Sequence, residues 1–208
     1  TPFAFTARGI ACGQAVLLRL LLRYTDPAGN ERQRVDLALP TGTPTTTTNV
    51  SYVGAPVAIP DGAPAGTRAY VSVSGAPTNL RSVTFSIDGT ACTTTAGATT
   101  VGIDHTASGD VDLALRSPSG TQVLLIDQVG GTGHNFCQVL LDDASAGASI
   151  QTVGGGQAPY TGTWKPAGLL SRFAGENPNG IWEVIAIDQG AGDTGSLRAF
   201  SLHLTGAQ

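Results

Sequence analysis

Residues 103–125, IDHTASGDVDLALRSPSGTQVLL, constrain the fold more than any other stretch of the chain. Two segments of alternating apolar and polar side chains follow one another here, separated by the turn sequence Ser-Pro-Ser-Gly-Thr. In the first of them, Val111, Leu113 and Leu115 alternate with Asp112, Ala114 and Arg116. Side chains on a strand point alternately to its two faces, so this period predicts a strand with one buried and one wet face.

The same pattern of short strands and turns continues over most of the chain. Only 12% of the residues are charged, and 28 glycines and 12 prolines separate the apolar stretches. Such spacing is typical of an all-β sandwich, and a hydrophobic share of 41% in 208 residues can fill its core. We expect strands at residues 83–87, 100–105, 111–116, 123–127, 137–141, 181–187 and 197–204. A single helical turn is expected at residues 169–174.

Residues 1–42 form a separate block that predicts a short strand and a β-hairpin. Leu18, Leu20 and Leu22 alternate with Arg19, Leu21 and Arg23, and Asp-Pro-Ala-Gly-Asn at residues 26–30 is a turn sequence. A leucine-rich helix over residues 15–23 is the competing interpretation. Because two or three strands cannot close a sandwich, we interpret this block as part of a larger β-sandwich module. The threonine-rich residues 43–51 are expected to be a linker.

Composition excludes two classes of function. The net charge is −4 and Lys165 is the single lysine, whereas phosphate binding needs clustered basic side chains. We therefore expect no nucleic-acid partner. The longest apolar run is broken by Arg19, so no membrane span is expected either. The chain begins with Thr-Pro rather than Met, as expected of a processed or excised fragment.

The three cysteines, Cys12, Cys92 and Cys137, lack the spacing of a zinc site. A disulfide between Cys92 and Cys137 is favoured over free buried thiols, and it leaves Cys12 without a partner in this stretch.

A hydrolytic site is not indicated. His105, His134 and His203 are the histidines of the chain, and none stands beside a Gly-x-Ser-x-Gly nucleophile motif. Structural or solvent-exposed roles are expected for all three. Cys137 precedes apolar residues of a strand and has no basic neighbour in sequence, which argues against a nucleophilic thiolate.

Acidic residues gather in the turns. Calcium prefers carboxylate and carbonyl oxygens on glycine-rich loops, and the calcium candidates are Asp110, Asp142, Asp143, Glu176 and Asp188. Asp104, Asp112 and Asp193 stand in the same turns. The alternative is that these aspartates simply cap turns, as aspartates commonly do.

Exposed aromatic rings would indicate carbohydrate binding. Tyr160 and Trp164 in the segment PYTGTWKP are the surface candidates, whereas Trp182 and Phe173 are expected in the core.

Several motifs together resemble one family. Their order is His-Thr, Gly-Asp, Ser-Pro-x-Gly-Thr, Phe-x-Gly, Asn-Gly-x-Trp, Asp and Gly-x-Leu, and they span nearly all of residues 52–208. This region resembles the P domain, or Homo B domain, of the furin and kexin proprotein convertases and of many secreted bacterial proteases. Val111 departs mildly from the leucine that is usual there.

The resemblance implies a jelly-roll-like β-sandwich without chemistry of its own. It would pack beside a protease catalytic domain and tune the stability, calcium response and pH response of that domain. Bacterial members also have cysteines at the positions of Cys92 and Cys137, which supports the disulfide. Asp110, Asp188 and Glu176 fall on acidic positions of the family pattern.

Residues 1–42 lie outside this likeness and are more weakly similar to the Ig-like or CARDB-like modules of secreted bacterial metalloproteases. The expected function is a non-catalytic C-terminal region of a secreted bacterial serine- or metallo-endopeptidase. Its partner would be the catalytic domain of the same parent protein, and calcium would be its cofactor. The alternative is a carbohydrate- or protein-binding module that targets a secreted hydrolase to its substrate. An independent enzyme ranks last, and the chain itself contains no recognisable catalytic domain.

Overall fold

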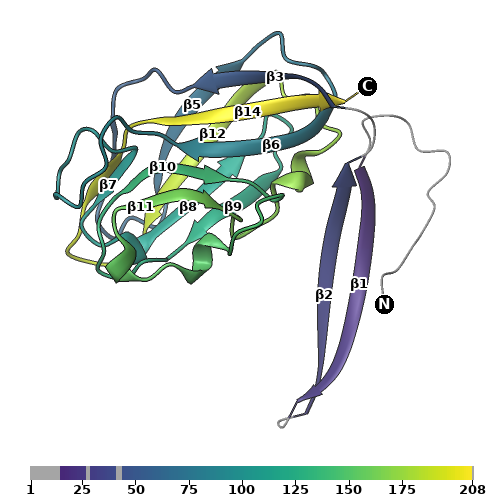
Figure 1. The fold of residues 1–208 in the computed structure, drawn as a ribbon, viewed down its shortest axis with the longest axis horizontal. Coiled ribbons are helices and arrows are strands. Elements are labelled where there is room, and N and C mark those ends of the chain that lie inside the picture. The colour runs from purple at the N-terminus through teal and green to yellow at the C-terminus, as the bar shows by residue number, and fades with distance from the viewer. Residues whose placement is uncertain (1–14, 27–28, 41–43, 208) are drawn as a thin grey trace.

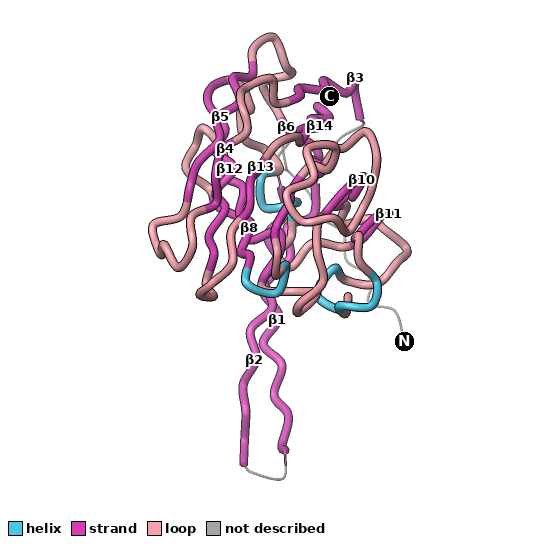
Figure 2. The backbone as a smooth tube through the Cα atoms, turned by 90° about the vertical axis from the view of Figure 1, so that its left-hand side faces the viewer, coloured by secondary structure: helices cyan, strands magenta, loops and turns pink. Residues whose placement is uncertain are grey.

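The structure is a computed structural model that describes residues 15–26, 29–40 and 44–207. The first two segments are β1 (Ala15–Asp26) and β2 (Gly29–Pro40), an antiparallel pair in register from Ala15–Pro40 to Asp26–Gly29. The hairpin projects from the rest of the chain in both views (Figures 1 and 2). The predicted hairpin is therefore confirmed and the competing helix is wrong. Cys12 and the short strand expected before it lie outside the described residues.

The remaining described residues form a sandwich of two sheets. The larger sheet has the order β3 (Pro44–Ser51), β14 (Phe200–Ala207), β6 (Leu80–Ile87), β10 (Phe136–Leu141), β7 (Ile103–His105), β13 (Gly195–Leu197) and β4 (Val57–Ile59), and β11 (Tyr160–Trp164) pairs in parallel with β10. The smaller sheet has the antiparallel order β5 (Thr67–Val73), β12 (Gly180–Asp188), β8 (Val111–Arg116) and β9 (Gln122–Asp127). This architecture confirms the all-β sandwich predicted from the sequence.

Alternation along the strands builds the core between the sheets. Val111, Leu113 and Leu115 of β8 are fully buried, as their spacing predicts. Ala114, on the opposite face of the strand, is only 6% exposed, so that face is less wet than expected. Large aromatic side chains fill the rest of the interior, with Phe85 and Phe200 stacked at 5.6 Å between ring centroids. Burial of these side chains is the main favourable term for the fold.

The linker predicted at residues 43–51 is wrong for most of its length, because Pro44–Ser51 forms β3 at the edge of the larger sheet. Its register with β14 runs from Ser51–Ser201 to Ala207–Pro44. The physical reason is that threonine is β-branched and suits extended backbone. An edge strand needs little apolar surface, and Val50 is the apolar side chain that β3 packs against the core.

Helical structure in the described part of the chain is limited to short 3₁₀ segments: η1 (Ser108–Asp110), η2 (Ile150–Thr152), η3 (Gly155–Gln157) and η4 (Leu170–Phe173). The last confirms the helical turn expected at residues 169–174. The strand expected at residues 197–204 is divided into β13 and β14. The backbone N–H groups of Arg198 and Ala199 both donate to Gly102 O, and this bends the chain between the two strands. No helix of the described chain is long and apolar enough to span a membrane.

Candidate functional site

Two of the predicted calcium ligands, Asp142 and Asp143, accept hydrogen bonds from backbone N–H groups. Asp142 Oδ1 accepts a hydrogen bond of 2.8 Å from Ala144 N and closes a local turn. The Asp143 carboxylate accepts bonds of 2.9 Å from Leu170 N and 2.7 Å from Ser171 N. Both donors belong to the first residues of η4, where helix N–H groups lack partners within the helix. Asp143 therefore fixes η4 to the end of β10.

Glu176 joins two turns that are distant in sequence. Its Oε1 accepts a hydrogen bond from Thr121 Oγ1, and its backbone O accepts one of 3.0 Å from Leu80 N. Nearby, Gly180 lies so close to Pro118 that a Cβ at this glycine would stand 2.9 Å from the proline side chain. The Ser-Pro-Ser-Gly-Thr and Asn-Gly-x-Trp motifs thus pack against each other, which indicates that these signature residues maintain the fold.

Asp188 and His105 form a buried pair between the two sheets. His105 Nε2 lies 3.2 Å from Asp188 Oδ2, and both side chains are fully buried. Asp188 Oδ1 accepts a second bond, of 3.0 Å, from Gly190 N. Because β7 and β12 belong to different sheets, this pair joins them at one end of the sandwich. The structural role expected for His105 agrees with this environment.

Asp110 and Asp188 both approach Gly190, in the loop that follows β12. Asp110 O accepts a bond of 2.7 Å from Gln189 N, and a Cβ at residue 190 would lie 2.2 Å from Asp110 Oδ2. Among the residues that the structure describes, no three His, Cys, Asp or Glu side chains form a group that could hold a metal ion. The donor set therefore does not fit a calcium site built from these side chains, and calcium binding stays a prediction.

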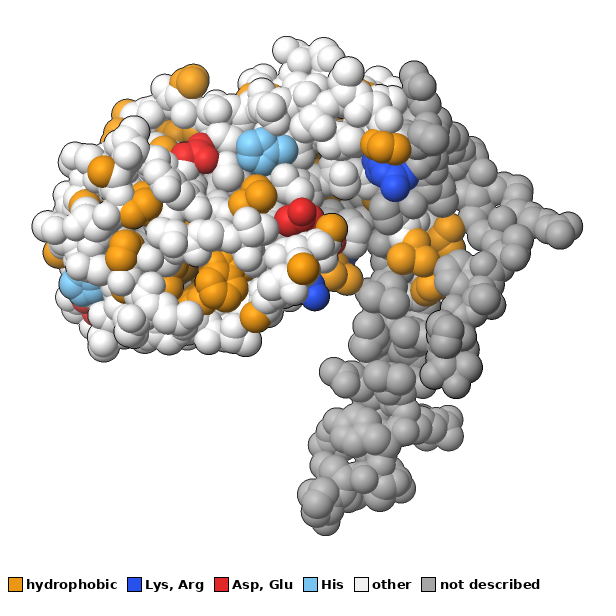
Figure 3. Space-filling model, in the orientation of Figure 1, with side chains coloured by type: hydrophobic (Ala, Val, Ile, Leu, Met, Phe, Trp, Pro, Cys, Tyr) orange, Lys and Arg blue, Asp and Glu red, His pale blue; other side chains and the backbone are white. Residues whose placement is uncertain are grey.

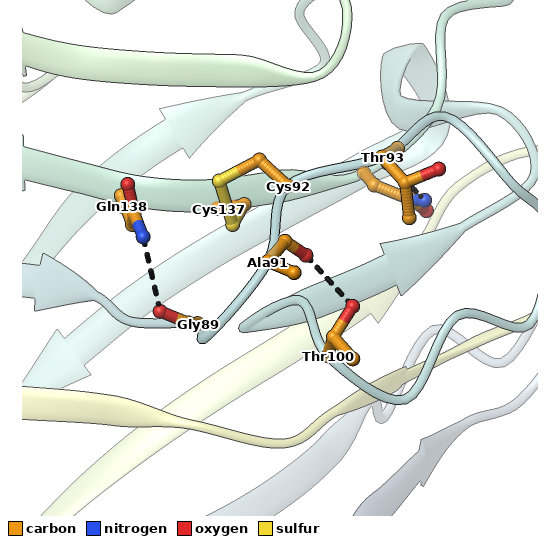
Figure 4. The surroundings of a disulfide bond; sticks show 8 residues. Gly89, Ala91, Cys92, Thr93, Thr100, Cys137 and Gln138 are labelled. Carbon is orange, nitrogen blue, oxygen red and sulfur yellow. Dashed lines mark hydrogen bonds between the residues drawn. A yellow bond between two sulfur atoms is a disulfide. The ribbon is translucent and has the colours of Figure 1, made fainter.

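The predicted disulfide is confirmed between Cys92 and Cys137, whose Cα atoms are 5.5 Å apart (Figure 4). It attaches the loop after β6 to the buried strand β10. Hydrogen bonds on either side support the same attachment: Gln138 Nε2 donates to Gly89 O at 3.3 Å and Thr100 Oγ1 donates to Ala91 O at 2.7 Å (Figure 4). The loop is held in one place by both covalent and polar contacts.

The expected surface pair of aromatic rings is not formed. Tyr160 is only 1% exposed and its hydroxyl donates to Gly130 O at 2.8 Å, so its assignment to the surface is wrong. Gly130 leaves the space that the ring needs, because a Cβ there would lie 2.2 Å from the tyrosine hydroxyl. Trp164 is partly buried against the core, and Trp182 and Phe173 are fully buried as predicted.

Sequence reasoning missed a polar network on the outer face of the larger sheet. His203 Nδ1 lies 2.8 Å from Asn49 Oδ1, and His203 Nε2 lies 3.1 Å from Ser86 Oγ. Ser86 Oγ donates to Asp88 Oδ1 at 2.6 Å, and Ser201 Oγ donates to Asp88 Oδ2 at 2.6 Å. This face is mostly uncharged, with a histidine and acidic side chains among scattered hydrophobic ones (Figure 3).

The network includes the residue types of a serine hydrolase but not their arrangement. A catalytic serine must give its proton to the histidine, whereas the Ser86 hydroxyl gives its proton to Asp88. Beside the network lies a shallow groove of about 280 Å³, lined by residues 86–89 and 138–140. The bonds connect β3, β14 and β6, and the geometry is that of a structural brace. Asn49 and His203 are 154 positions apart in sequence, so only the order of the strands could have revealed the contact.

Comparison with known proteins identifies the family. Residues 96–204 match the family model described as the proprotein convertase P-domain. Among solved structures, the chain is similar to the serine protease of Aeromonas sobria in complex with a chaperone, with a TM-score of 0.48 and 16% identity over 90% of this chain and 36% of that chain. A second structure of the Aeromonas sobria serine protease gives a TM-score of 0.47 and 14% identity over 90% and 37% of the two chains.

The chain thus spans little more than a third of the length of those proteases. No curated protein matches it. Since the family model covers more than half of the 208 residues and includes the motifs of β7 to β14, the chain belongs to the proprotein convertase P-domain family.

Proposed function

We propose that this chain is an accessory region of a secreted bacterial protease, and that it stabilises or modulates the catalytic domain of the same parent protein. The observation that carries the proposal is the family match over residues 96–204, since the P domain is a non-catalytic domain of proteases. The parent would be a serine- or metallo-endopeptidase. A structural disulfide is typical of oxidising compartments and supports an extracellular location.

The environment of the histidines supports a non-catalytic role. His105 is buried against Asp188, His134 Nδ1 lies 3.0 Å from Thr94 O, and His203 belongs to the polar network. Each ring has partners that hold it within the fold. A general base has to reach the proton of a substrate or nucleophile, and these contacts favour structural roles for the three rings.

The proposal is tested by deletion in the parent protease. A variant without residues 44–207 should have a catalytic domain with a lower unfolding temperature and a lower yield of active enzyme. A matched variant without residues 15–40 would separate the contribution of the hairpin from that of the sandwich. Unchanged unfolding and unchanged specific activity after removal of the sandwich would refute the proposal.

The second candidate function is to target a hydrolase to carbohydrate. It depends on two exposed aromatic rings, Tyr160 and Trp164. Burial of the Tyr160 ring removes that support. Carbohydrate binding stays a prediction, and a pull-down of the chain with insoluble polysaccharides would measure that binding directly.

A further inference from the structure

The outer edge of β3 is the least protected edge of the sandwich among the residues that the structure describes. β3 ends the larger sheet, where β14 pairs with one of its edges and no described strand pairs with the other. The hairpin β1–β2 projects away from the side of the sheet that β3 occupies (Figures 1 and 2). An exposed edge of this kind presents a row of N–H and C=O groups to any extended backbone. We call it the β3 edge.

The register with β14 decides which backbone groups the β3 edge offers. Tyr52 N donates to Phe200 O at 2.9 Å, and the pairing continues in step along β3 as far as Thr47. Hydrogen-bonded and non-hydrogen-bonded pairs alternate along an antiparallel ladder, so every second residue before Tyr52 bonds to β14. The residues between them, Ser51, Asn49 and Thr47, therefore direct their N–H and C=O groups to the β3 edge.

The side chains of these three residues already have partners within the chain. Each of them places a polar atom 2.8 Å from a polar atom of its cross-strand neighbour on β14: Thr47 with Thr205, Asn49 with His203 and Ser51 with Ser201. What the β3 edge offers to a partner is therefore its backbone. A partner has to supply another extended strand rather than particular side chains.

The devices that usually protect an edge strand are missing from β3. Its sequence, PTTTTNVS, has no charged residue, and its one proline is the first residue. The other outer strands of the described sandwich are shorter, charged or covered. Residues 167–168 donate two backbone hydrogen bonds to β9, residues 148–150 pair with Lys165 at the end of β11, Arg68 stands on β5, and β4 has only 3 residues. Charges, short strands and covering loops all oppose edge-to-edge pairing.

The β3 edge of a second copy is the strand that fits best. Antiparallel pairing about a twofold axis sets Asn49 opposite Asn49 of the other copy, and Thr47 opposite Ser51. Each of these pairs exchanges two hydrogen bonds, so every N–H and C=O that the three residues direct outward obtains a partner. Self-pairing brings equal charges together in a charged strand, and β3 has none to oppose it.

An exposed apolar side chain next to β3 agrees with this occupant. Val53, directly after the strand, is 95% exposed. If the pairing with Asn49 at its centre is extended, Val53 comes to lie opposite Thr45 of the second copy, at the start of its β3. Contact there would remove part of the valine side chain from water, which is favourable.

We propose that two copies of this chain associate through their β3 edges and thereby join their larger sheets into one continuous antiparallel sheet. Only one strand of each copy takes part, so the dimer belongs to the weak, concentration-dependent class of interfaces. The proposal is independent of the accessory function proposed above, because it rests on backbone groups of the described chain.

Sedimentation velocity of the 208-residue chain tests the proposal, at concentrations from about 5 to 500 µM, where a weak interface becomes populated. A reversible dimer should appear as the concentration rises. Thr47→Pro removes an N–H group on the β3 edge and leaves the ladder with β14 intact, since proline is tolerated where the N–H faces solvent. This variant should raise the dissociation constant of the dimer by about tenfold or more.

Thr47→Ser keeps the N–H group and is the matched control, so it should dimerise like the unmodified chain. Circular dichroism checks that both variants are folded. A chain that stays monomeric over the whole concentration range would overturn the proposal, and so would a Thr47→Pro chain that dimerises as well as the control. Loss of the dimer with Tyr70→Ser but not with Thr47→Pro would also overturn it, because the copies would then meet through the smaller sheet, where Tyr70 is 56% exposed.

Amide hydrogen exchange by NMR gives a second measurement that needs no substitution. The N–H groups of Thr48 and Val50 bond to β14 in every copy, whereas those of Thr47, Asn49 and Ser51 lie on the β3 edge. Raising the concentration until most of the chain is dimeric should slow exchange at the latter three by about fivefold or more and leave the former two unchanged. Unchanged exchange at Thr47, Asn49 and Ser51 in a dimeric sample would show that another surface forms the contact and would contradict the proposal.

Discussion

Asp143→Ala removes a carboxylate that the structure uses as a helix cap. Asp143 lies two residues after the end of β10, and its side chain accepts hydrogen bonds from the backbone N–H groups of Leu170 and Ser171, at 2.9 and 2.7 Å. Alanine offers no acceptor, so both donors at the start of η4 lose their partner. The sequence alone allowed a different role for Asp143, as a calcium ligand, and the substitution can separate the two.

The size of the effect follows from the cap geometry. Loss of an N-terminal cap costs about 0.5–2 kcal/mol, and two bonds to a charged, half-buried acceptor place Asp143 near the upper end, at about 2 kcal/mol. For a chain of this length, each kcal/mol changes the unfolding temperature by about 2–4 °C. We therefore expect the Asp143→Ala chain to unfold about 4–8 °C below the unmodified one.

Calorimetry of both chains, with added calcium and with a chelator, is the assay. A cap acts without metal, so the difference between the chains should be the same under both conditions. Asp142→Ala, which removes one bond to Ala144 N in a local turn, is the matched control and should have a smaller effect. The reasoning is refuted if the difference disappears with the chelator, because Asp143 would then act through calcium. It is also refuted if Asp143→Ala leaves the unfolding temperature unchanged.

Three further predictions concern the disulfide, the core and a titrating carboxyl. Replacing Cys92 and Cys137 by serine opens a loop of 45 residues and should lower the free energy of unfolding in urea by about 4 kcal/mol; an unchanged urea midpoint would contradict a structural role. Trp182→Ala in the core should destabilise by about 3–5 kcal/mol, and Trp164→Ala by clearly less, so equal urea midpoints would be unexpected. Because the pKa of Asp112 is raised in the folded state, its ionised form opposes folding, and stability is lost as the pH rises from the unfolded pKa through the folded one. The stability of Asp112→Asn relative to the unmodified chain should therefore increase from acidic to neutral pH in urea titrations, and a pH-independent difference would contradict the raised pKa.

Local patterns were sufficient for the sandwich and its strands. Alternation places Val111, Leu113 and Leu115 in the core because a strand has only two faces, and this holds whatever the neighbouring strand is. The disulfide was favoured over free thiols because Cys92 and Cys137 lack metal-site spacing and because the family resemblance has cysteines at these positions, and the structure confirms it. Signature motifs such as Asn-Gly-x-Trp also indicated the family, because the turns they build require those residue types.

These local sequence patterns could not predict which distant segments pair with one another. The threonines of β3 are compatible with a linker or with a strand, and the free edge of β14 decides in favour of the strand. Tyr160 is buried because Gly130 provides space for its ring. Gly130 is distant from residue 160 in sequence, so the local pattern around Tyr160 does not predict that space.

The sequence by itself determined the fold class and the core positions of strands such as β8, since these depend on the period of the side chains, and it favoured the disulfide, which the family resemblance supported. Only the tertiary structure decided what each polar group does. Asp143 caps η4 and His203 meets Asn49 because folding brings distant segments together. Tyr70 and Ile181 are likewise far apart in the sequence, and they become diagonal neighbours only when β5 pairs with β12.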